Sequence, residues 1–321
     1  MAATRFSIVV PVYNEEECIR ETYRRLTEVM AQTGEEYEIV FVNDGSRDRS
    51  ADIIRDLCAT DSRLRLLEFS RNFGHSAAVT AGLQFASGQA VVIIDADLQD
   101  PPEMILPMIK KWREGYDVVY GKRIKRKGET LFKKATAALF YRVLKSMTSV
   151  DIPVDTGDFR LMDRKVVDEL NHLQEQSRFI RGLVSWVGFK QIAVEYERDK
   201  RFAGETKYPF KKMLKFALDG ITSFSYKPLK LAAYLGFLLS AASFLYLLIV
   251  VYEKLFTAYA QPGWASIVAV NLLFNGITLI LLGVMGEYIG RIYEETKRRP
   301  LFVIKQKTGF TDGDRDYADR R

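Results

Sequence analysis

The sequence predicts an α/β domain, with helices on both faces of a mostly parallel sheet, followed by two membrane-spanning helices. Short apolar runs alternate with helical patterns through the first hundred residues, which is typical of a parallel sheet. Two uncharged stretches follow in the C-terminal third. The 321 residues suggest about two domains. With 48% hydrophobic and 27% charged residues, the composition is that of a folded chain and excludes disorder for most of it.

Strands and helices are expected to alternate strictly in the N-terminal part. In chain order they are a strand at 6–12, a helix at 15–31, a strand at 37–42, a helix at about 49–60, a strand at 64–69, a helix at about 75–87 and a strand at 90–94. Ligands of such sheets bind beyond the carboxyl ends of the strands. Polar side chains gather at each of these ends, in the segments 13–15, 43–44, 70–72 and 95–97.

The motifs at these strand ends narrow the class of ligand. The first strand is not followed by GxGxxG, and the chain contains no GxxxxGK[ST]. A dinucleotide oxidoreductase and a P-loop NTPase are therefore disfavoured. Asp95 and Asp97 follow the fourth predicted strand directly. Two carboxylates two residues apart can share a Mg²⁺ or Mn²⁺ ion that bridges a diphosphate.

Two basic stretches stand out from an otherwise acidic chain. Residues 120–145 hold nine Lys and Arg against one Glu, and residues 198–230 hold nine against three acids. Nucleic acid, phosphorylated ligands and an anionic membrane surface are the candidate partners. Apolar residues at helical spacing predict interfacial amphipathic helices at about 128–147 and 207–225, which favours the membrane and argues against nucleic acid. Ordinary surface helices packed on the domain are the alternative.

Two spans are predicted, at 231–252 and 265–286, each with 22 uncharged residues. A helix of that length is about 33 Å long, which is enough for a hydrocarbon core of roughly 30 Å. The outer flanks are basic, so both termini are expected in the cytoplasm. The predicted organisation is a cytoplasmic domain at 1–227, a transmembrane hairpin at 228–290 and a cytoplasmic tail at 291–321.

The cysteines and histidines are expected to be structural. Cys18 and Cys58 cannot build a disulfide framework, which suggests a reducing compartment, and both fall on predicted helices as packing residues. His75 and His172 are the two histidines of the chain. His75 closely follows the polar strand-end segment 70–72, but a structural role is expected for both.

Seven segments together resemble one protein family. They are PVYNEE (11–16), VNDGSRD (42–48), SRNFGHSAAVTAGL (70–83), DADLQDPPE (95–103), GDFRLMDR (157–164), RFAGETKYPFKK (201–212) and GEYIGRIYEETKRRP (286–300). The chain resembles family-2 glycosyltransferases of the GT-A fold over about 5–305. Within them it is similar to bacterial polyprenyl-phosphate glycosyltransferases with two spans. These include undecaprenyl-phosphate glucosyltransferases of O-antigen modification and the aminoarabinose transferase of lipid A, with dolichol-phosphate mannose synthase more distant.

The resemblance assigns a nucleotide site to the first half of the chain. The positions that it places in or near the pocket for the nucleobase and ribose are Pro11, Tyr13, Glu15, Asp44, Arg71 and Gly74. Asp44 would bind the base edge, although a helix cap is the alternative role. Asp95 and Asp97 would hold ribose, Mg²⁺ or Mn²⁺ and diphosphate. Asp97 would be the main metal ligand, with Gln99 close by.

The resemblance assigns the reacting centre to later residues. Asp158 would be the carboxylate nearest the reacting atoms, and Asp155 is the alternative. Arg123, Arg201 and Lys207 would contact the phosphates of acceptor or donor, because two anions must meet in one site.

The implied activity is that of an inverting hexosyltransferase in the bacterial inner membrane. It would move one hexose, with UDP-glucose favoured, from a nucleotide sugar to undecaprenyl phosphate for modification of cell-envelope glycans such as the O-antigen of lipopolysaccharide. GDP-mannose, UDP-GlcNAc and a UDP-aminoarabinose derivative stay open as donors. A processive polysaccharide synthase is an alternative, although the chain lacks a QxxRW motif. A membrane-bound nucleotide-sugar sensor is another. The resemblance also implies a homo-oligomer, plausibly a tetramer.

Overall fold

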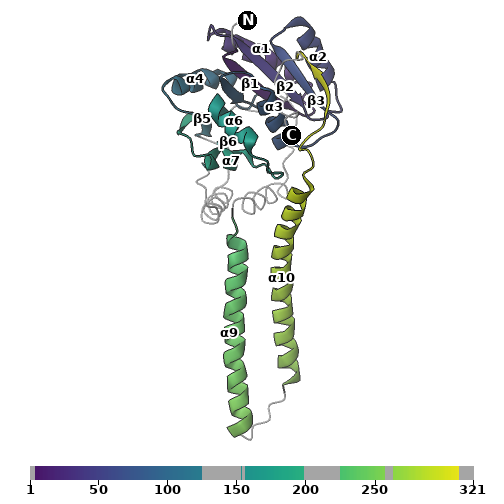
Figure 1. Ribbon diagram of the computed structural model, residues 1–321, viewed down its shortest axis with the longest axis vertical. Helices are drawn as coiled ribbons and strands as arrows, with labels where there is room; N and C mark the ends of the chain where they lie inside the picture. The colour runs from purple at the N-terminus through teal and green to yellow at the C-terminus, as the bar shows by residue number, and fades with distance from the viewer. Residues whose placement is uncertain (1–3, 125–152, 154–155, 199–224, 257–262, 311–321) are drawn as a thin grey trace.

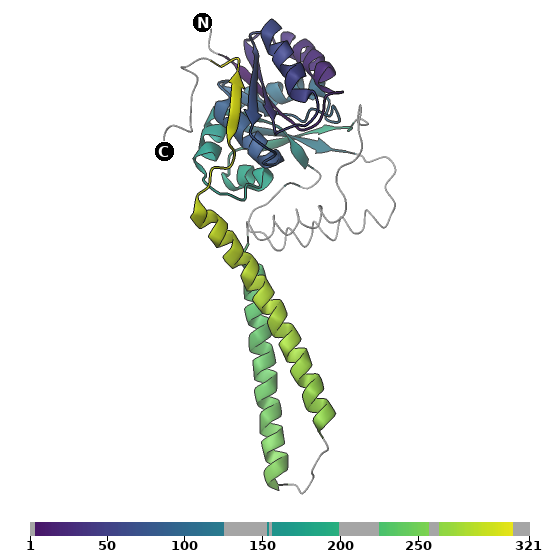
Figure 2. The ribbon, with the colours of Figure 1, turned by 90° about the vertical axis from the view of Figure 1, so that its right-hand side faces the viewer.

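The computed structural model describes residues 4–124, 153, 156–198, 225–256 and 263–310. One α/β domain contains the sheet, and two long helices project from it (Figure 1). A view from the side shows the two helices running next to each other away from the domain (Figure 2). The predicted interfacial helices at about 128–147 and 207–225 lie outside the described residues, apart from Ser225.

Among the described residues, eight strands form one mixed sheet in the order β7-β5-β6-β4-β1-β2-β3-β8. Parallel pairs join β1 to β2 and β4, β2 to β3, and β5 to β7. β6 runs antiparallel between β4 and β5, and β8 runs antiparallel to β3. The strands are β1 Phe6–Val12, β2 Tyr37–Asn43, β3 Leu64–Phe69, β4 Ala90–Ile93, β5 Val118–Arg123, β6 Thr156–Asp163, β7 Gln191–Tyr196 and β8 Ile304–Thr308.

The structure confirms the three helices predicted in the N-terminal part, with one shifted start, and adds four helical elements that were not predicted. In chain order, the helical elements of the domain are α1 Ile19–Ala31, α2 Ser50–Thr60, α3 His75–Phe85, the 3₁₀ turn η1 Pro102–Met104, α4 Ile105–Arg113, α6 Arg164–His172 and α7 Ile180–Trp186. α1 begins four residues after the predicted start at residue 15. The amides of Asn14 and Glu15 donate instead to the side chains of Ser46 and Ser50, which holds this segment as a loop.

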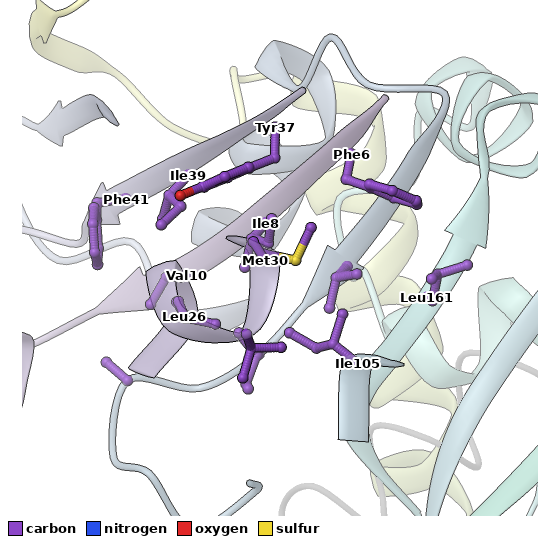
Figure 3. Packing of buried hydrophobic residues seen from close by; sticks show 14 of the residues in the cluster. Phe6, Ile8, Val10, Leu26, Met30, Tyr37, Ile39, Phe41, Ile105 and Leu161 are labelled. Carbon is purple, nitrogen blue, oxygen red and sulfur yellow. The ribbon is translucent and has the colours of Figure 1, made fainter. Parts of the chain in front are cut away.

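Alternating side chains of the central strands build a core on each face of the sheet. Ile8 and Val10 pack with α1, α2 and α4, whereas Val9 packs with α3, α6 and α7. Figure 3 shows Phe6, Ile8 and Val10 among the residues of the first core. All residues of β1 and β2 are buried, as expected for strands covered on both sides. The apolar runs in the sequence therefore mark the centre of the sheet.

The two long helices are α9, Lys227–Phe256, and α10, Trp264–Lys297. Their candidate spans, Lys227–Tyr246 and Leu273–Lys297, have no residue buried inside the structure. Large apolar side chains such as Phe237, which is 77% exposed, point away from protein. Both helices are long and apolar enough to cross a membrane, and their apolar side chains are not covered by the rest of the described chain.

The chain after the second span returns to the sheet. The predicted tail at 291–321 begins inside α10, which continues to Lys297, and β8 then pairs with β3. The sequence IKQKT of β8 has exposed lysines and is short, as is common for an edge strand. Backbone pairing needs no apolar run, and a prediction from hydrophobicity therefore misses this strand. Residues 311–321 lie outside the described part of the chain.

The close packing of α3 on β1 makes a testable prediction. A Cβ atom on Gly82 would lie 2.1 Å from Cγ1 of Val9. Gly82→Ala is therefore expected to lower the Tm in detergent by roughly 3–10 °C, because overpacking outweighs the helix propensity of alanine. Gly283→Ala in α10, where no atom lies within 4 Å of the added methyl group, is the control. An unchanged or raised Tm for Gly82→Ala would contradict the packing described.

Candidate functional site

Polar loops from several strands meet at the carboxyl edge of the sheet. The loop after β1 and the loop after β2 are joined by hydrogen bonds, including Asn14 N–H to Ser46 Oγ at 3.0 Å and Glu16 N–H to Asp48 Oδ2 at 3.2 Å. Asn14 has a φ of 54°, in the left-handed region that asparagine tolerates. The first two strand ends thus form one connected wall.

This wall carries the first predicted nucleotide residues. Pro11 is buried in β1, whereas Tyr13 is 36% exposed and Glu15 is half-buried. Tyr13 therefore has a free ring surface just beyond the end of β1. A planar exposed ring at this position can stack on another planar group.

Asp44 connects this wall to the loop after β3. It is buried, and its Oδ1 and Oδ2 accept the amides of Phe73 at 2.6 Å and Gly74 at 2.9 Å. Burial raises the pKa of Asp44, and the two backbone hydrogen bonds oppose that rise. A Cβ on Gly45 would lie 2.5 Å from the carbonyl carbon of Arg71, so glycine permits the close approach of the two loops. Asp44 thus has a structural role whether or not it also binds a base.

Arg71 lies on the exposed side of the same loop. Its guanidinium carbon is 4.1 Å from the centroid of the Phe73 ring, in cation–π geometry. Gly74 has a φ of +103° and precedes the first turn of α3. The predicted residues Arg71 and Gly74 therefore belong to one loop that is fixed to β2 through Asp44.

The loop after β4 contains the predicted metal residues. Asp97 is 7% exposed, and its Oδ1 accepts the amide of Gln99 at 3.1 Å. Leu98, between them, has a φ of 57°, a rare conformation for a branched apolar residue. Burial raises the pKa of Asp95, the charges of Asp97, Asp158 and Asp100 add to the rise, and His75 opposes it. Negative charge is thus concentrated at the end of β4.

The loop after β4 suits a divalent cation that is coordinated partly by the protein and partly by a bound substrate. In the described part of the chain, no three His, Cys, Asp or Glu side chains converge as a metal site made by protein alone. Asp95 and Asp97 supply hard carboxylate oxygens, which Mg²⁺ and Mn²⁺ prefer. Mg²⁺ commonly takes one or two carboxylates and completes its shell with substrate phosphates and water. The pair therefore suits a metal that arrives with, or is completed by, a diphosphate.

Asp158 lies beside this loop because β6 runs antiparallel to β4. Arg181, at the start of α7, donates from Nε to Oδ1 at 2.9 Å and from Nη2 to Oδ2 at 3.2 Å. Burial disfavours the charged carboxylate, but Arg181 and His75 outweigh it and hold the pKa of Asp158 well below the ordinary value. Asp158 is thus an ionised group with both oxygens already engaged.

His75 lies between the two groups of carboxylates, in contact with residues predicted for the site, and the structural role expected for it stays a prediction. Its Nε2 lies 3.2 Å from Oδ2 of Asp158 and 3.9 Å from Oδ1 of Asp95. Burial lowers the pKa of His75, but the hydrogen bond to Asp158 and the charge of Asp95 outweigh it and raise the pKa to about 9. Its position directly after Gly74, close to the strand-end segment 70–72, was the available sequence signal.

A second buried cluster lies at the ends of β5 and β7. Asp100, which is 1% exposed, accepts a hydrogen bond from the hydroxyl of Tyr196 and lies 3.4 Å from Nη2 of Arg123. Nε of Arg198 is 3.5 Å from the same carboxylate. A Cβ on Gly157 would lie 2.6 Å from Nη2 of Arg123, so glycine makes room for the guanidinium. Asp100 therefore fixes two arginines close to the carboxyl edge of the sheet.

The sequence analysis did not identify several members of these clusters. Arg181, Tyr196 and Arg198 carried no motif that pointed to the site. The predicted residues Arg201 and Lys207, and the alternative carboxylate Asp155, lie outside the described residues.

Comparisons with known proteins give the family. The model of glycosyl transferase family 2 matches residues 7–170, and that of the GtrB C-terminal hairpin matches residues 227–292. The uncharacterized glycosyltransferase YkcC of Bacillus subtilis is 63% identical over 316 residues, 98% of each chain. The bactoprenol glucosyl transferase of Shigella phage SfV is 43% identical over 303 residues, 94% of this chain and 99% of that one.

Solved structures also resemble the chain at low sequence identity. The mannosyltransferase PcManGT from Pyrobaculum calidifontis, in complex with GDP-Man and Mn²⁺, is 19% identical with a TM-score of 0.43. The match covers 90% of this chain and 88% of that one.

The ion pair between Arg181 and Asp158 makes a prediction for stability. The side chains are 27% and 15% exposed. Arg181→Met is expected to lower the Tm at neutral pH by roughly 3–10 °C, because it removes a main partner of a mostly buried carboxylate. The depressed pKa of Asp158 means that the pair stabilises the fold at neutral pH and is lost as the pH falls through that pKa.

A double-mutant cycle with Asp158→Asn separates the pair from other effects of each change. The double variant is expected to recover part of the loss. Arg24→Met with Glu21→Gln, on the exposed face of α1, is the control pair and should change the Tm little. Strictly additive effects at Arg181 and Asp158 would refute the coupling.

Proposed function

The chain belongs to glycosyltransferase family 2, and from this premise we propose that it transfers glucose from UDP-glucose to undecaprenyl phosphate, inverting the anomeric carbon. The product is a lipid-linked monosaccharide for modification of cell-envelope glycans. The carrying observation is the carboxyl edge of the sheet with paired carboxylates, Asp95 and Asp97, in a domain joined to two unburied apolar helices. The phage bactoprenol glucosyl transferase, similar over almost its whole length, supports both the sugar and the lipid.

The donor site is proposed at the ends of β1 to β4. Tyr13 stacks on the nucleobase, and Pro11 and Glu15 line the wall beside it. Arg71, which is exposed beside Asp44 and Gly74, contacts the nucleoside diphosphate. This role suits a guanidinium, which binds phosphate oxygens with two parallel hydrogen bonds.

The diphosphate is proposed to lie against the loop after β4. Asp97 and Asp95 would hold Mg²⁺ or Mn²⁺, with Gln99 beside them. When bound, the metal ion neutralises charge that develops on the departing diphosphate. The concentration of carboxylates around Asp95 explains why a cation is needed there before an anionic donor can bind.

The acceptor phosphate is proposed to meet Arg123, with Arg201 and Lys207 completing the basic site. Asp100 fixes the guanidinium of Arg123, so little side-chain entropy is lost when it binds a phosphate. α9 and α10 keep the domain at the bilayer, where the lipid phosphate lies. A polyprenyl tail leaves the bilayer only at great cost, so the enzyme must act at the surface.

The reaction is a single displacement. An oxygen of the acceptor phosphate forms a bond to the anomeric carbon as the bond from that carbon to the diphosphate breaks, and UDP departs. An α-linked donor thus gives a β-linked product. A phosphate monoester has a second pKa near 6 and is mostly dianionic at neutral pH, so it needs little help from a base. Asp158, engaged by Arg181 and His75, positions groups rather than accepting a proton.

The proposed location is the bacterial inner membrane, with the catalytic domain and both termini in the cytoplasm. Basic residues flank the outer ends of the two spans, which supports this orientation. A homo-oligomer stays a prediction of the family resemblance.

A transfer assay tests the proposal. Purified protein in lipid, with Mn²⁺ and undecaprenyl phosphate, is expected to move radiolabel from UDP-glucose to the lipid fraction, and not from UDP-GlcNAc or GDP-mannose. Asp97→Asn should reduce transfer by roughly a hundredfold or more, because a metal ligand is lost. Asp52→Asn on the exposed face of α2 is the control. Transfer of another sugar would refute UDP-glucose as the donor. Formation of a polymer would favour the processive polysaccharide synthase.

Changes at Arg123 test the acceptor site separately. Arg123→Gln is expected to raise the KM for undecaprenyl phosphate about tenfold or more, because a charge-assisted contact to phosphate is lost. The affinity for UDP, measured by calorimetry, should stay unchanged. Lys122→Gln, whose side chain pairs with Glu195, is the neighbouring control. Loss of UDP binding in Arg123→Gln would instead assign this residue to the donor.

A further inference from the structure

The chain beyond the second membrane helix forms a strap, residues 298–310, that reaches the donor side of the sheet. β8 within it pairs with β3, from Leu66 opposite Thr308 to Phe69 opposite Ile304. The last contact lies where β3 ends, since Val303 O accepts the amide of Ser70 at 3.0 Å. The strap thus ends its pairing at the first residue of the loop that carries Arg71.

A row of aromatic rings continues from the strap into that loop. Phe302 stacks on Phe69, with ring centroids 5.0 Å apart and planes 9° apart. Phe69 packs edge to face against Phe73, with ring centroids 5.7 Å apart. The guanidinium carbon of Arg71 lies 4.1 Å from the centroid of the Phe73 ring. Residues from the C-terminal strap and the exposed arginine are therefore joined by direct packing.

The loop is held from its other side by Asp44. The amides of Phe73 and Gly74 donate to that carboxylate, and Gly45 lets the backbone of Arg71 approach closely. Two supports thus act on one short exposed segment: hydrogen bonds from β2, and aromatic packing from the strap. A segment fixed before binding loses less conformational entropy when a ligand arrives.

We propose that Phe302 is a positioning residue for the donor site: through Phe69 and Phe73 it fixes loop 70–74 so that Arg71 is held ready for the nucleoside diphosphate. The inference rests on the proposed donor site for the role of Arg71, and extends it to a residue beyond the membrane spans. Covering the edge of β3 requires the backbone pairing of β8 and not the ring of Phe302. A substitution of the Phe302 side chain should therefore disturb loop 70–74 and leave the pairing of β8 with β3 intact.

The test compares Phe302→Ala with Phe302→Tyr, which keeps the ring, and with Val303→Ala, a neighbouring change at an exposed side chain. Hydrogen exchange of the Phe73 and Gly74 amides in the ligand-free protein reports the order of the loop. Calorimetry with UDP reports the affinity. Phe302→Ala is expected to speed exchange in loop 70–74 and to weaken UDP binding by about 5- to 20-fold, since an aromatic pair is lost.

The pattern across the variants decides the outcome. Exchange in β1 should stay unchanged in Phe302→Ala, the KM for the donor should rise, and kcat at saturating donor should change less than about threefold. Phe302→Tyr and Val303→Ala should behave as the wild type. Unchanged loop exchange, or unchanged UDP affinity with a faster-exchanging loop, would overturn the proposal. Failure of the wild type to bind UDP would refute the proposed donor, while the exchange of the two amides would still decide whether Phe302 orders the loop.

Discussion

The crowding of carboxylates at one edge of the sheet is the constraint on which the site depends. Asp95 and Asp97 lie in the loop after β4, Asp158 lies on the adjacent strand β6, and Asp100 follows closely in the same loop. Like charges so near one another would raise each other's pKa and favour neutral acids. Cationic side chains placed against them prevent this for Asp158, through Arg181 and His75. The remaining negative charge near Asp95 is what a divalent cation would balance, before an anionic diphosphate is added.

Pairing of arginines with buried carboxylates also occurs at two separate places in the site. Arg181 neutralises a carboxylate at the centre, whereas Arg123 is held by Asp100 at the end of β5. A guanidinium held by one buried carboxylate keeps donors for a further anion, because it has five N–H groups. The fold therefore supplies a cation beside the carboxylates without spending all of its hydrogen-bonding capacity on them. Under the proposed function, this arrangement would let two phosphorylated substrates approach one reacting carbon.

The sequence predicted those elements of the fold that leave a hydrophobic pattern within a short stretch of the chain. The apolar runs of β1 to β4 and the two long apolar helices follow from composition and period alone. Asp95 and Asp97 were identified by their spacing after a strand, and their metal-binding role stays a prediction. The partners of Asp158 do not follow from such patterns, because His75 is 83 residues away in the chain and Arg181 is 23 residues away. Only the antiparallel insertion of β6 brings them together. β8 was missed for another reason, since a polar edge strand joins a sheet through its backbone.

The membrane anchor and the catalytic edge are parts of one connected structure. Near its end α10 contacts the segment before α7, where Glu295 accepts the amide of Gln176 and Arg291 donates to Ser177. α7 carries Arg181, and the strap after α10 reaches β3 and its loop. α10 thus connects to the surroundings of Asp158 and to the proposed donor loop. If the acceptor is a membrane lipid, as proposed, the donor must be held at a fixed height above the membrane, and these two connections would provide that geometry.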